Sequence, residues 1–439
     1  MERYSEYKDS GVQWLGEIPS HWEVYRIRYN YYLKGRIGWQ GLKADEFCDN
    51  GPFLVTGTDF CDGKVNWDTC YHISQQRFEE APEIHVKKGD LLMTKDGTVG
   101  KTAYIDEKPD QVSLNSHLLI IRPIHQDVCD NRYLQYLIMS GVFRKFTDIH
   151  STGSIMASIS QEKFSDFSFP LPTFSEQDAI VSYLDKVTTQ IDTAISQQQK
   201  MIDLLNERKQ IIINNAVTKG LDPNVKMKDS GVDWIGEICS SWNIFRLKHL
   251  LCGNLMYGAN ESAESEDPSF PRYIRITDID ENGKLKPETF RSLPPTKAEP
   301  YLLKKGDILF ARSGATSGKT YLFDEDIKAC FAGYLIKAQV SNKIISRYLM
   351  YYTRSGIYEN WKNSIFIQAT IQNIGADKYS NLRIPLPSIS EQKEIINFLD
   401  SEMYKIDKVL DMHKCQISLL QERKQIIIND VVTGKVKVS

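Results

Sequence analysis

The stretch PLPTFSEQDAIVSYLDKVTTQID at residues 170–192 returns as PLPSISEQKEIINFLDSEMYKID at residues 385–407. Further along each copy, LLNERKQIIINNAVT at residues 204–218 is matched by LLQERKQIIINDVVT at residues 419–433. After its opening Pro-x-Pro, neither copy contains another Gly or Pro, the residues that most often end a helix. The sequence therefore predicts one long helix in each copy, ~60 Å in length at ~1.5 Å per residue.

Each predicted helix has a recognisable start. The Pro-x-Pro ends the preceding element, and a serine suited to the helix N-terminus follows, Ser175 in the first copy and Ser390 in the second. Asp178 stands three residues after Ser175, which is close to a capping box. We therefore expect both helices to begin at these serines.

Apolar residues in both helices keep a 4–3 spacing, which is typical of coiled coils. Polar residues interrupt this seam at Gln198, Arg208, His413, Gln416 and Arg423. They either fix the register of the coiled coil or bind a partner. The predicted seam consists of Ile180, Leu184, Val187, Ile191, Ala194, Met201, Leu205 and Ile212 in the first helix, and Ile395, Leu399, Ile406, Val409, Leu420 and Ile427 in the second.

The remainder of the chain is also duplicated. KDSGVQWLGEIPSHWEVYRI at residues 8–27 returns as KDSGVDWIGEICSSWNIFRL at 228–247, and KKGDLLMTKDGTVGKTAYI at 87–105 as KKGDILFARSGATSGKTYLF at 304–323. Between these anchors the two copies differ. The divergence indicates either two modules that recognise different targets or drift after duplication. The chain thus consists of two copies of one unit, each a globular module followed by a long helix.

Each module, called a head below, is predicted to be α+β. FLVTGTD, GDLLMTK, TAYID and HLLIIRP predict short strands, whereas NRYLQYLIMSGVFRKF and SRYLMYYTRSGIYENW predict helices. The termini of a compact domain usually lie close together, so the second head should bring the end of the first helix beside the start of the second, which makes the helices antiparallel. The predicted domains are the first head at 1–172, a central helix at 173–219, the second head at 220–387 and a C-terminal helix at 388–434.

Composition excludes several classes of protein. Hydrophobic residues make up 41% of the chain and charged residues 25%, which is typical of globular proteins. The net charge of −3 argues against an indiscriminate nucleic-acid binder, although it allows local basic loops. No apolar run is long enough to cross a membrane, and the N-terminus lacks a signal-peptide core. The eight cysteines form no C-x-x-C pair or zinc-type cluster, so we expect a cytoplasmic protein with free thiols and no metal site.

The loops 97–102 and 314–320 contain Gly-Lys-Thr and invite a nucleotide-binding interpretation. A P-loop, however, needs a glycine where this chain has Lys95 and Ser313, and it must open a helix, whereas these loops lead into strand-like TAYI and TYLF. Nucleotide binding is therefore rejected. The loops are either structural hairpin turns or DNA-contacting segments, and the sequence does not decide between the two.

Candidate DNA-contacting residues lie in these loops and in the divergent inserts, because two heads with different targets need different side chains there. Trp14, Trp22, Trp234 and Trp242 recur with the anchors and are expected in the core. No Ser/His/Asp or Cys/His arrangement recurs in both copies, which argues against catalysis by this chain. The DNA-contacting candidates are Arg36, Trp39, Gln40, Lys43, Lys95, Thr98 and Lys101 in the first head, and Asn254, Tyr257, Asn260, Arg275, Arg312, Ser313, Thr316 and Lys319 in the second.

The repeated KGD-[IL]-L-x…G-x-x-GKT loop, the P-L-P-x-x-S-E-Q helix start, the L-L-x-E-R-K-Q-x-I-I helix and the two-unit layout resemble the DNA-specificity subunit of type I restriction–modification enzymes. The resemblance covers essentially the whole chain. It implies two target-recognition domains, each for one half of an asymmetric bipartite site in double-stranded DNA, joined by antiparallel helices that set the gap. It also implies a non-catalytic subunit that docks two methyltransferase subunits and joins restriction subunits, with S-adenosylmethionine, ATP and Mg bound by those partners and none by this chain.

Two other functions are compatible with parts of the sequence. One is a coiled-coil scaffold whose duplicated heads bind proteins rather than DNA, which the acidic net charge slightly favours. Salt-dependent, sequence-selective DNA binding would distinguish it from a specificity subunit. The other, a nucleotide-using enzyme, depends on the rejected P-loop.

Overall fold

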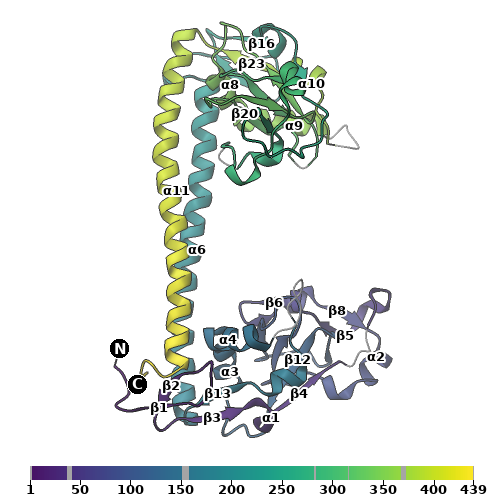
Figure 1. Cartoon of the computed structure of the whole chain (residues 1–439), viewed down its shortest axis with the longest axis vertical. Coiled ribbons are helices and arrows are strands. Elements are labelled where there is room, and N and C mark those ends of the chain that lie inside the picture. The colour runs from purple at the N-terminus through teal and green to yellow at the C-terminus, as the bar shows by residue number, and fades with distance from the viewer. Residues whose placement is uncertain are drawn as a thin grey trace. The chain divides into compact units, whose positions relative to one another are not determined.

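The computed structural model describes residues 2–36, 42–150, 158–280, 283–314, 316–366 and 372–438. The candidates Trp39 and Gln40 lie outside these residues. The chain divides into two compact units, Met1–Gln198 with Cys415–Ser439, and Gln199–Lys414. Each unit contains one head and a part of each long helix, α6 (Phe174–Thr218) and α11 (Ile389–Val432) (Figure 1).

The first head is built around a four-stranded antiparallel sheet in the order β10-β9-β12-β4. A second, three-stranded sheet has the order β11-β5-β8, in which β5 and β11 are parallel. The elements of the first head are β1 (Tyr7–Asp9), β2 (Glu17–Pro19), β3 (Glu23–Arg26), α1 (Ile27–Asn30), β4 (Tyr31–Gly35), β5 (Phe47–Val55), β6 (Phe60–Cys61), β7 (Lys64–Val65), β8 (Tyr71–Ile73), α2 (Gln75–Glu79), β9 (Leu91–Thr94), β10 (Thr102–Tyr104), β11 (Val112–Leu114), β12 (Leu118–Pro123), α3 (Asn131–Met139), α4 (Gly141–His150), α5 (Gln161–Ser165) and β13 (Ser168–Leu171).

The second head repeats this topology. Its four-stranded sheet has the order β20-β19-β22-β17, and β18 pairs in parallel with β21 as β5 does with β11. The elements are β14 (Met227–Asp229), β15 (Glu237–Cys239), β16 (Asn243–Arg246), β17 (Met256–Tyr257), β18 (Arg272–Ile274), α7 (Pro295–Ala298), β19 (Ile308–Ala311), β20 (Thr320–Leu322), β21 (Ala329–Phe331), β22 (Leu335–Ala338), α8 (Ser346–Tyr352), α9 (Gly356–Phe366), α10 (Ala376–Ser380) and β23 (Arg383–Leu386).

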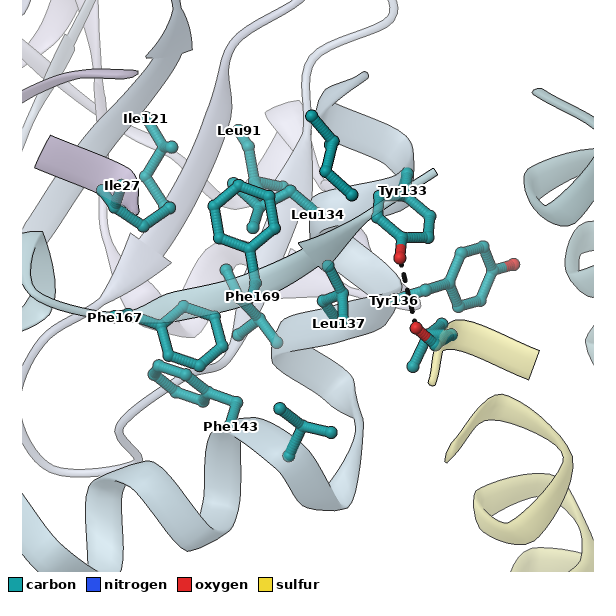
Figure 2. Packing of buried hydrophobic residues seen from close by; sticks show 14 of the residues in the cluster. Ile27, Leu91, Ile121, Tyr133, Leu134, Tyr136, Leu137, Phe143, Phe167 and Phe169 are labelled. Atoms are coloured by element: carbon teal, nitrogen blue, oxygen red, sulfur yellow. Dashed lines mark hydrogen bonds between the residues drawn. The ribbon is translucent and has the colours of Figure 1, made fainter. Parts of the chain in front are cut away.

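The central strands are continuous apolar runs because both faces of the sheet are buried. In β9, Leu91 and Met93 belong to the core formed with the helices, whereas Leu92 belongs to a second core on the other face of the sheet. Figure 2 shows the helix-side core, where Phe143, Phe167 and Phe169 pack together. The α+β class and the duplicated layout are therefore confirmed. No described helix combines the length and the apolar character needed to cross a membrane.

The predicted helix after β12 is interrupted. In the first head α3 ends at Met139 and α4 begins at Gly141, with the extended backbone of Ser140 between them. The Ser140 hydroxyl accepts a hydrogen bond from the backbone N–H of Val142 at 3.2 Å, so this side chain caps the second helix. The single-helix prediction over NRYLQYLIMSGVFRKF was wrong because the Ser-Gly pair favours a cap over an uninterrupted helix.

The prediction that Ser175 and Ser390 start the long helices was also wrong, by two residues. Thr173 and Ser388 precede the first helical residues, and each is bonded reciprocally to the glutamate three positions later. Ser388 donates its backbone N–H to Oε2 of Glu391 at 2.9 Å, and the backbone N–H of Glu391 donates to Oγ of Ser388 at 3.3 Å. The capping boxes thus use Glu176 and Glu391 rather than Asp178.

The two helices are antiparallel within each unit. In the second unit, Lys209 of α6 forms an ion pair with Asp407 of α11 at 2.6 Å. Trp242 bonds Glu391 at the start of α11 and also lies beside Gly220, just beyond the end of α6. In the first unit, Asp192 pairs with Lys424 at 2.7 Å. The indole of Trp22 there bonds Glu176 and lies beside Gly434, just beyond α11.

The buried stripe of the long helices departs from the predicted heptads. Ile180, Leu184, Ile191, Ile395, Leu399 and Ile406 are buried as predicted, and Val187, Leu205, Ile212, Leu420 and Ile427 are half-buried. Val409 is 37% exposed and Met201 44%, whereas the adjacent Leu410 and Ile202 are buried. From Ile191 the buried positions continue at Ile202 and Ile213, an eleven-residue spacing that follows a straight helix better than a strict heptad.

Candidate nucleic-acid interface

The Gly-Lys-Thr loops are tight turns between antiparallel strands, β9 to β10 in the first head and β19 to β20 in the second. Gly97, Gly100, Gly314 and Gly318 all have positive φ, between 69° and 85°, a region that favours glycine. Both loops lead into strands, which confirms the prediction that they are not P-loops.

The lysine of each Gly-Lys-Thr sequence is bonded within its own head. Lys101 donates from Nζ to the carbonyl oxygen of Gly57 at 3.1 Å, and Lys319 donates to that of Ile279 at 3.1 Å. Gly57 opens the 3₁₀ turn Gly57–Asp59 that follows β5. Ile279 comes directly after the matching 3₁₀ turn, Ile276–Asp278, that follows β18. The two lysines therefore hold the loop against this turn, which supports the structural interpretation for them.

β9 and β19 are central strands, and the residue just after each of them lies at the end of the four-stranded sheet where the Gly-Lys-Thr loop begins. Nζ of Lys95 lies 3.7 Å from where a Cβ of Gly35 would be, at the end of β4. At the matching position in the second head, the guanidinium of Arg312 lies 5.1 Å from the centre of the Tyr257 ring on β17. This cation–π contact holds Arg312 beside a half-exposed aromatic ring, a pairing suited to both phosphate and base contacts.

An exposed aromatic residue joins this edge and was missed as a DNA-contacting candidate. The backbone N–H of Arg312 donates to the carbonyl oxygen of Tyr334 at 2.9 Å, and the Tyr334 side chain is 67% exposed. In the first head Lys95 bonds the carbonyl oxygen of His117 in the same way, at 3.0 Å. The signal was available in the sequence, because Tyr334 and His117 occupy matching positions beside the matched cations.

The structure brings several second-head candidates together around this edge. Arg312 and Ser313 directly follow β19, and Tyr257 lies on β17, two strands away in the same sheet. The hydroxyl of Tyr257 accepts a hydrogen bond from the backbone N–H of Ala376 at 3.0 Å. Thr316 is exposed on the adjoining loop. In the first head, Lys95 is half-buried and Thr98 is exposed. We call these residues, with Tyr334 and His117, the loop edge of each head.

Two arginines among the candidates are used inside the fold. Arg36 is 2% exposed and donates to the carbonyl oxygen of Leu114 and the hydroxyl of Ser113, at 2.8 and 2.9 Å. Burial lowers the pKa of its guanidinium. Arg275 pairs with the buried Asp278 at 2.7 Å and also bonds the carbonyl oxygen of Thr289. These contacts tie both side chains to the protein, and neither placement supports a DNA contact.

The remaining insert candidates are exposed and scattered. Lys43, Asn254 and Asn260 all have exposed side chains, and their contact with DNA stays a prediction. Of the four tryptophans expected in the core, Trp22 and Trp242 are buried. Trp14 and Trp234 are half-buried. Among the described residues, no three His, Cys, Asp or Glu side chains gather as metal ligands would.

Comparison with known proteins gives a consistent result. The family model for the type I restriction modification DNA specificity domain matches twice, at residues 38–202 and 240–414. The MjaVIII type I restriction enzyme specificity subunit of Methanocaldococcus jannaschii is 24% identical, with 100% of this chain and 98% of the relative covered. The StySPI specificity subunit of Salmonella potsdam is 23% identical, with 87% of this chain and 82% of the relative covered.

Solved structures share the fold. A chain from a study of the assembly and conformational transition of a type I restriction–modification system has a TM-score of 0.69 at 16% identity, over 95% of this chain and 99% of the other. The HsdS subunit from Thermoanaerobacter tengcongensis has a TM-score of 0.50 at 15% identity, over 95% of this chain and 98% of that subunit.

Proposed function

Because the chain belongs to the type I restriction modification DNA specificity family, we propose that each of its heads recognises one half of an asymmetric bipartite DNA site. As a specificity subunit the chain does not carry the catalytic site. Methyl transfer with S-adenosylmethionine is assigned to methyltransferase subunits, and cleavage with ATP and Mg to restriction subunits, in the cytoplasm.

The observation that carries this proposal is that the two heads share one fold but have different side chains at the loop edge. The two heads share their sheet order, their tight loops and their lysine tethers. At the matching positions of the loop edge, however, the first head has Lys95 and His117, and the second has Arg312 and Tyr334. Base recognition depends on side-chain hydrogen bonds and stacking, so these two edges would select different base pairs.

A repeated apolar surface on the long helices supports the proposal that the chain docks two methyltransferase subunits. In the second unit Leu204 and Ile211 of α6 are 48% and 51% exposed. In the first unit the matching residues of α11, Leu419 and Ile426, are 59% and 52% exposed. Exposed leucine and isoleucine one heptad apart mark a surface that another protein covers. Because the surface occurs twice, it suits two copies of one partner.

Two of the five polar residues predicted to interrupt the seam belong to this outer surface. Arg208 lies between Leu204 and Ile211 along α6, and Arg423 lies between Leu419 and Ile426 along α11, and both arginines are exposed. They do not interrupt the buried stripe. Of the two interpretations of these positions, partner binding is therefore the better supported for Arg208 and Arg423.

Binding measurements on the assembled complex test the function. The full chain, co-purified with its methyltransferase subunits, should bind one DNA sequence far more tightly than a scrambled duplex, and its affinity should fall as salt rises. Equal, weak binding to every duplex by a confirmed complex would contradict the proposal and favour the protein-binding scaffold.

A further inference from the structure

A groove of about 840 Å³ lies inside the second unit, where the second head meets its parts of α6 and α11. The tight loop at Thr316–Thr320 forms one wall, the ends of α8 and α9 form another, and the long helices close the third. The groove thus adjoins the loop edge that is proposed to contact DNA.

The groove carries an excess of positive charge. Six lysine and arginine residues line it against three acidic residues. Two of the acids are already neutralised, since Lys209 pairs with Asp407 at 2.6 Å and Lys362 pairs with Glu359 at 2.8 Å. The positive charge left over is not balanced by the remaining acid, Asp411.

Arg354, at the C-terminal side of α8, is the central unbalanced cation. Among the described residues its guanidinium forms no ion pair, and the residue is exposed to solvent where it lines the groove. Arg347 forms an ion pair with Asp400 at 2.9 Å, and Arg354 does not share that carboxylate. Nη2 of Arg354 lies only 2.9 Å from where a Cβ of Gly283 would be, so a glycine makes room for it. A guanidinium stays protonated, and an anion would stabilise it there.

The matching groove of the first unit lacks this charge. It has a volume of about 770 Å³ and is lined by Val99, Ile138, Met139 and Phe143, among others. Met139 stands where the second copy has Arg354, and Thr147 stands where it has Lys362. The duplication therefore provides its own comparison, in which the groove of the second unit has an excess of positive charge and that of the first unit, lined by one arginine and two aspartates, does not.

We propose that the groove of the second unit binds a phosphate of the DNA backbone through Arg354, and that the first unit has no such contact. The proposal rests on the DNA-recognition function proposed above. DNA is the anion that the specificity function brings to the adjoining loop edge, and arginine is suited to bidentate phosphate binding. Arg354 would position the second head on DNA without selecting bases.

The test is the salt dependence of DNA affinity for the full chain assembled with its methyltransferase subunits. In the Arg354→Met variant, which installs the first-copy residue, the slope of log K against log salt should fall in magnitude by about 0.9, and the recognised sequence should not change. Arg354→Lys should keep most of the slope. Lys305→Met serves as a control, because this exposed lysine of the same head lies outside the groove.

The outcomes separate the two claims. An unchanged slope in Arg354→Met, with sequence-selective binding intact, overturns the phosphate site and leaves the specificity function standing. Absence of selective binding in the unmodified complex overturns both. If Arg354→Met destabilises the chain, Met139→Arg in the first copy should steepen the slope, and failure to do so also counts against the site.

Discussion

Trp242 donates its indole N–H to Oε1 of Glu391 at 3.3 Å, which bonds a buried tryptophan of the second head to the capping residue of α11. Glu391 also accepts hydrogen bonds from the backbone and the hydroxyl of Ser388, at 2.9 and 2.8 Å. One carboxylate therefore closes the helix N-terminus and fixes the head against it. Glu176 has the same role toward Trp22 in the first unit.

This arrangement predicts a pH-dependent contribution to stability. Burial alone would raise the pKa of Glu391, but hydrogen bonds from Ser388 and Trp242 lower it below the usual 4.5. A carboxylate with a lowered pKa stabilises the fold above about pH 4.5, and that contribution is lost as pH falls through the folded-state pKa. We therefore expect Glu391→Gln to lower the free energy of unfolding at neutral pH, with a difference from the native chain that shrinks in acid.

Urea denaturation at several pH values measures this difference. Glu394→Gln is the matched control, because Glu394 is exposed one turn further along the same helix. A stability difference for Glu391→Gln that stays constant from neutral to acidic pH would show that the ionised carboxylate is not what stabilises the cap.

The tight loop of the first head predicts unequal effects of two similar substitutions. Gly97 and Gly100 both have positive φ, so alanine at either position should cost ~1–2 kcal/mol in backbone strain. A Cβ at Gly97 would meet nothing within 4 Å, whereas one at Gly100 would lie 2.6 Å from Cε1 of the buried Phe143. Gly100→Ala should therefore be the more destabilising by ~1–3 kcal/mol in chemical denaturation. Equal losses would mean that Phe143 moves aside freely.

The repeated apolar surface predicts a change in stoichiometry. Leu204→Glu with Ile211→Glu should remove one methyltransferase subunit from the co-expressed complex and leave the other, because charged side chains disfavour only the surface on α6. Native mass spectrometry would count the subunits. Ser196→Glu, at an exposed polar position of the same helix, is the control. Retention of two subunits by the double variant would exclude this surface as the docking site.

The helices predict how the recognised DNA gap changes with their length. Deleting one heptad from both α6 and α11 shortens each by ~10.5 Å, which corresponds to about three base pairs of DNA. The methylated motif should keep both half-sites and lose base pairs only from the gap, as mapped by sequencing of modified DNA. A changed half-site would contradict the assignment of spacing to the helices.

The sequence was sufficient for the duplication, the strands around the Gly-Lys-Thr loops and the antiparallel helices, because each depends on local pattern or chain continuity. It placed the helix starts at Ser175 and Ser390, although the capping-box pattern that selects Thr173 and Ser388, each three residues before a glutamate, was also present in the sequence. It also placed Val409 in the seam, because a heptad pattern cannot register the slow rotation of a long, nearly straight helix.

The candidate site was less predictable for a physical reason. An arginine in a divergent loop can serve the fold or the ligand, and only its partners distinguish the two, as Arg36 against Ser113 shows. Tyr334 was overlooked because an exposed tyrosine after a strand carries no motif of its own. Arg354 lies in the turn between α8 and α9, at a position where the first copy has a methionine, and its significance emerges only when both grooves are compared.

The central claim is that the two heads together specify one bipartite DNA site. The most direct measurement is sequencing of the methylated adenines in DNA from cells that co-express this chain with its methyltransferase subunit. The account predicts a single asymmetric motif of two different half-sites separated by an unread gap, methylated on both strands. DNA without any methylated motif, from cells in which the complex is confirmed to assemble, would contradict it.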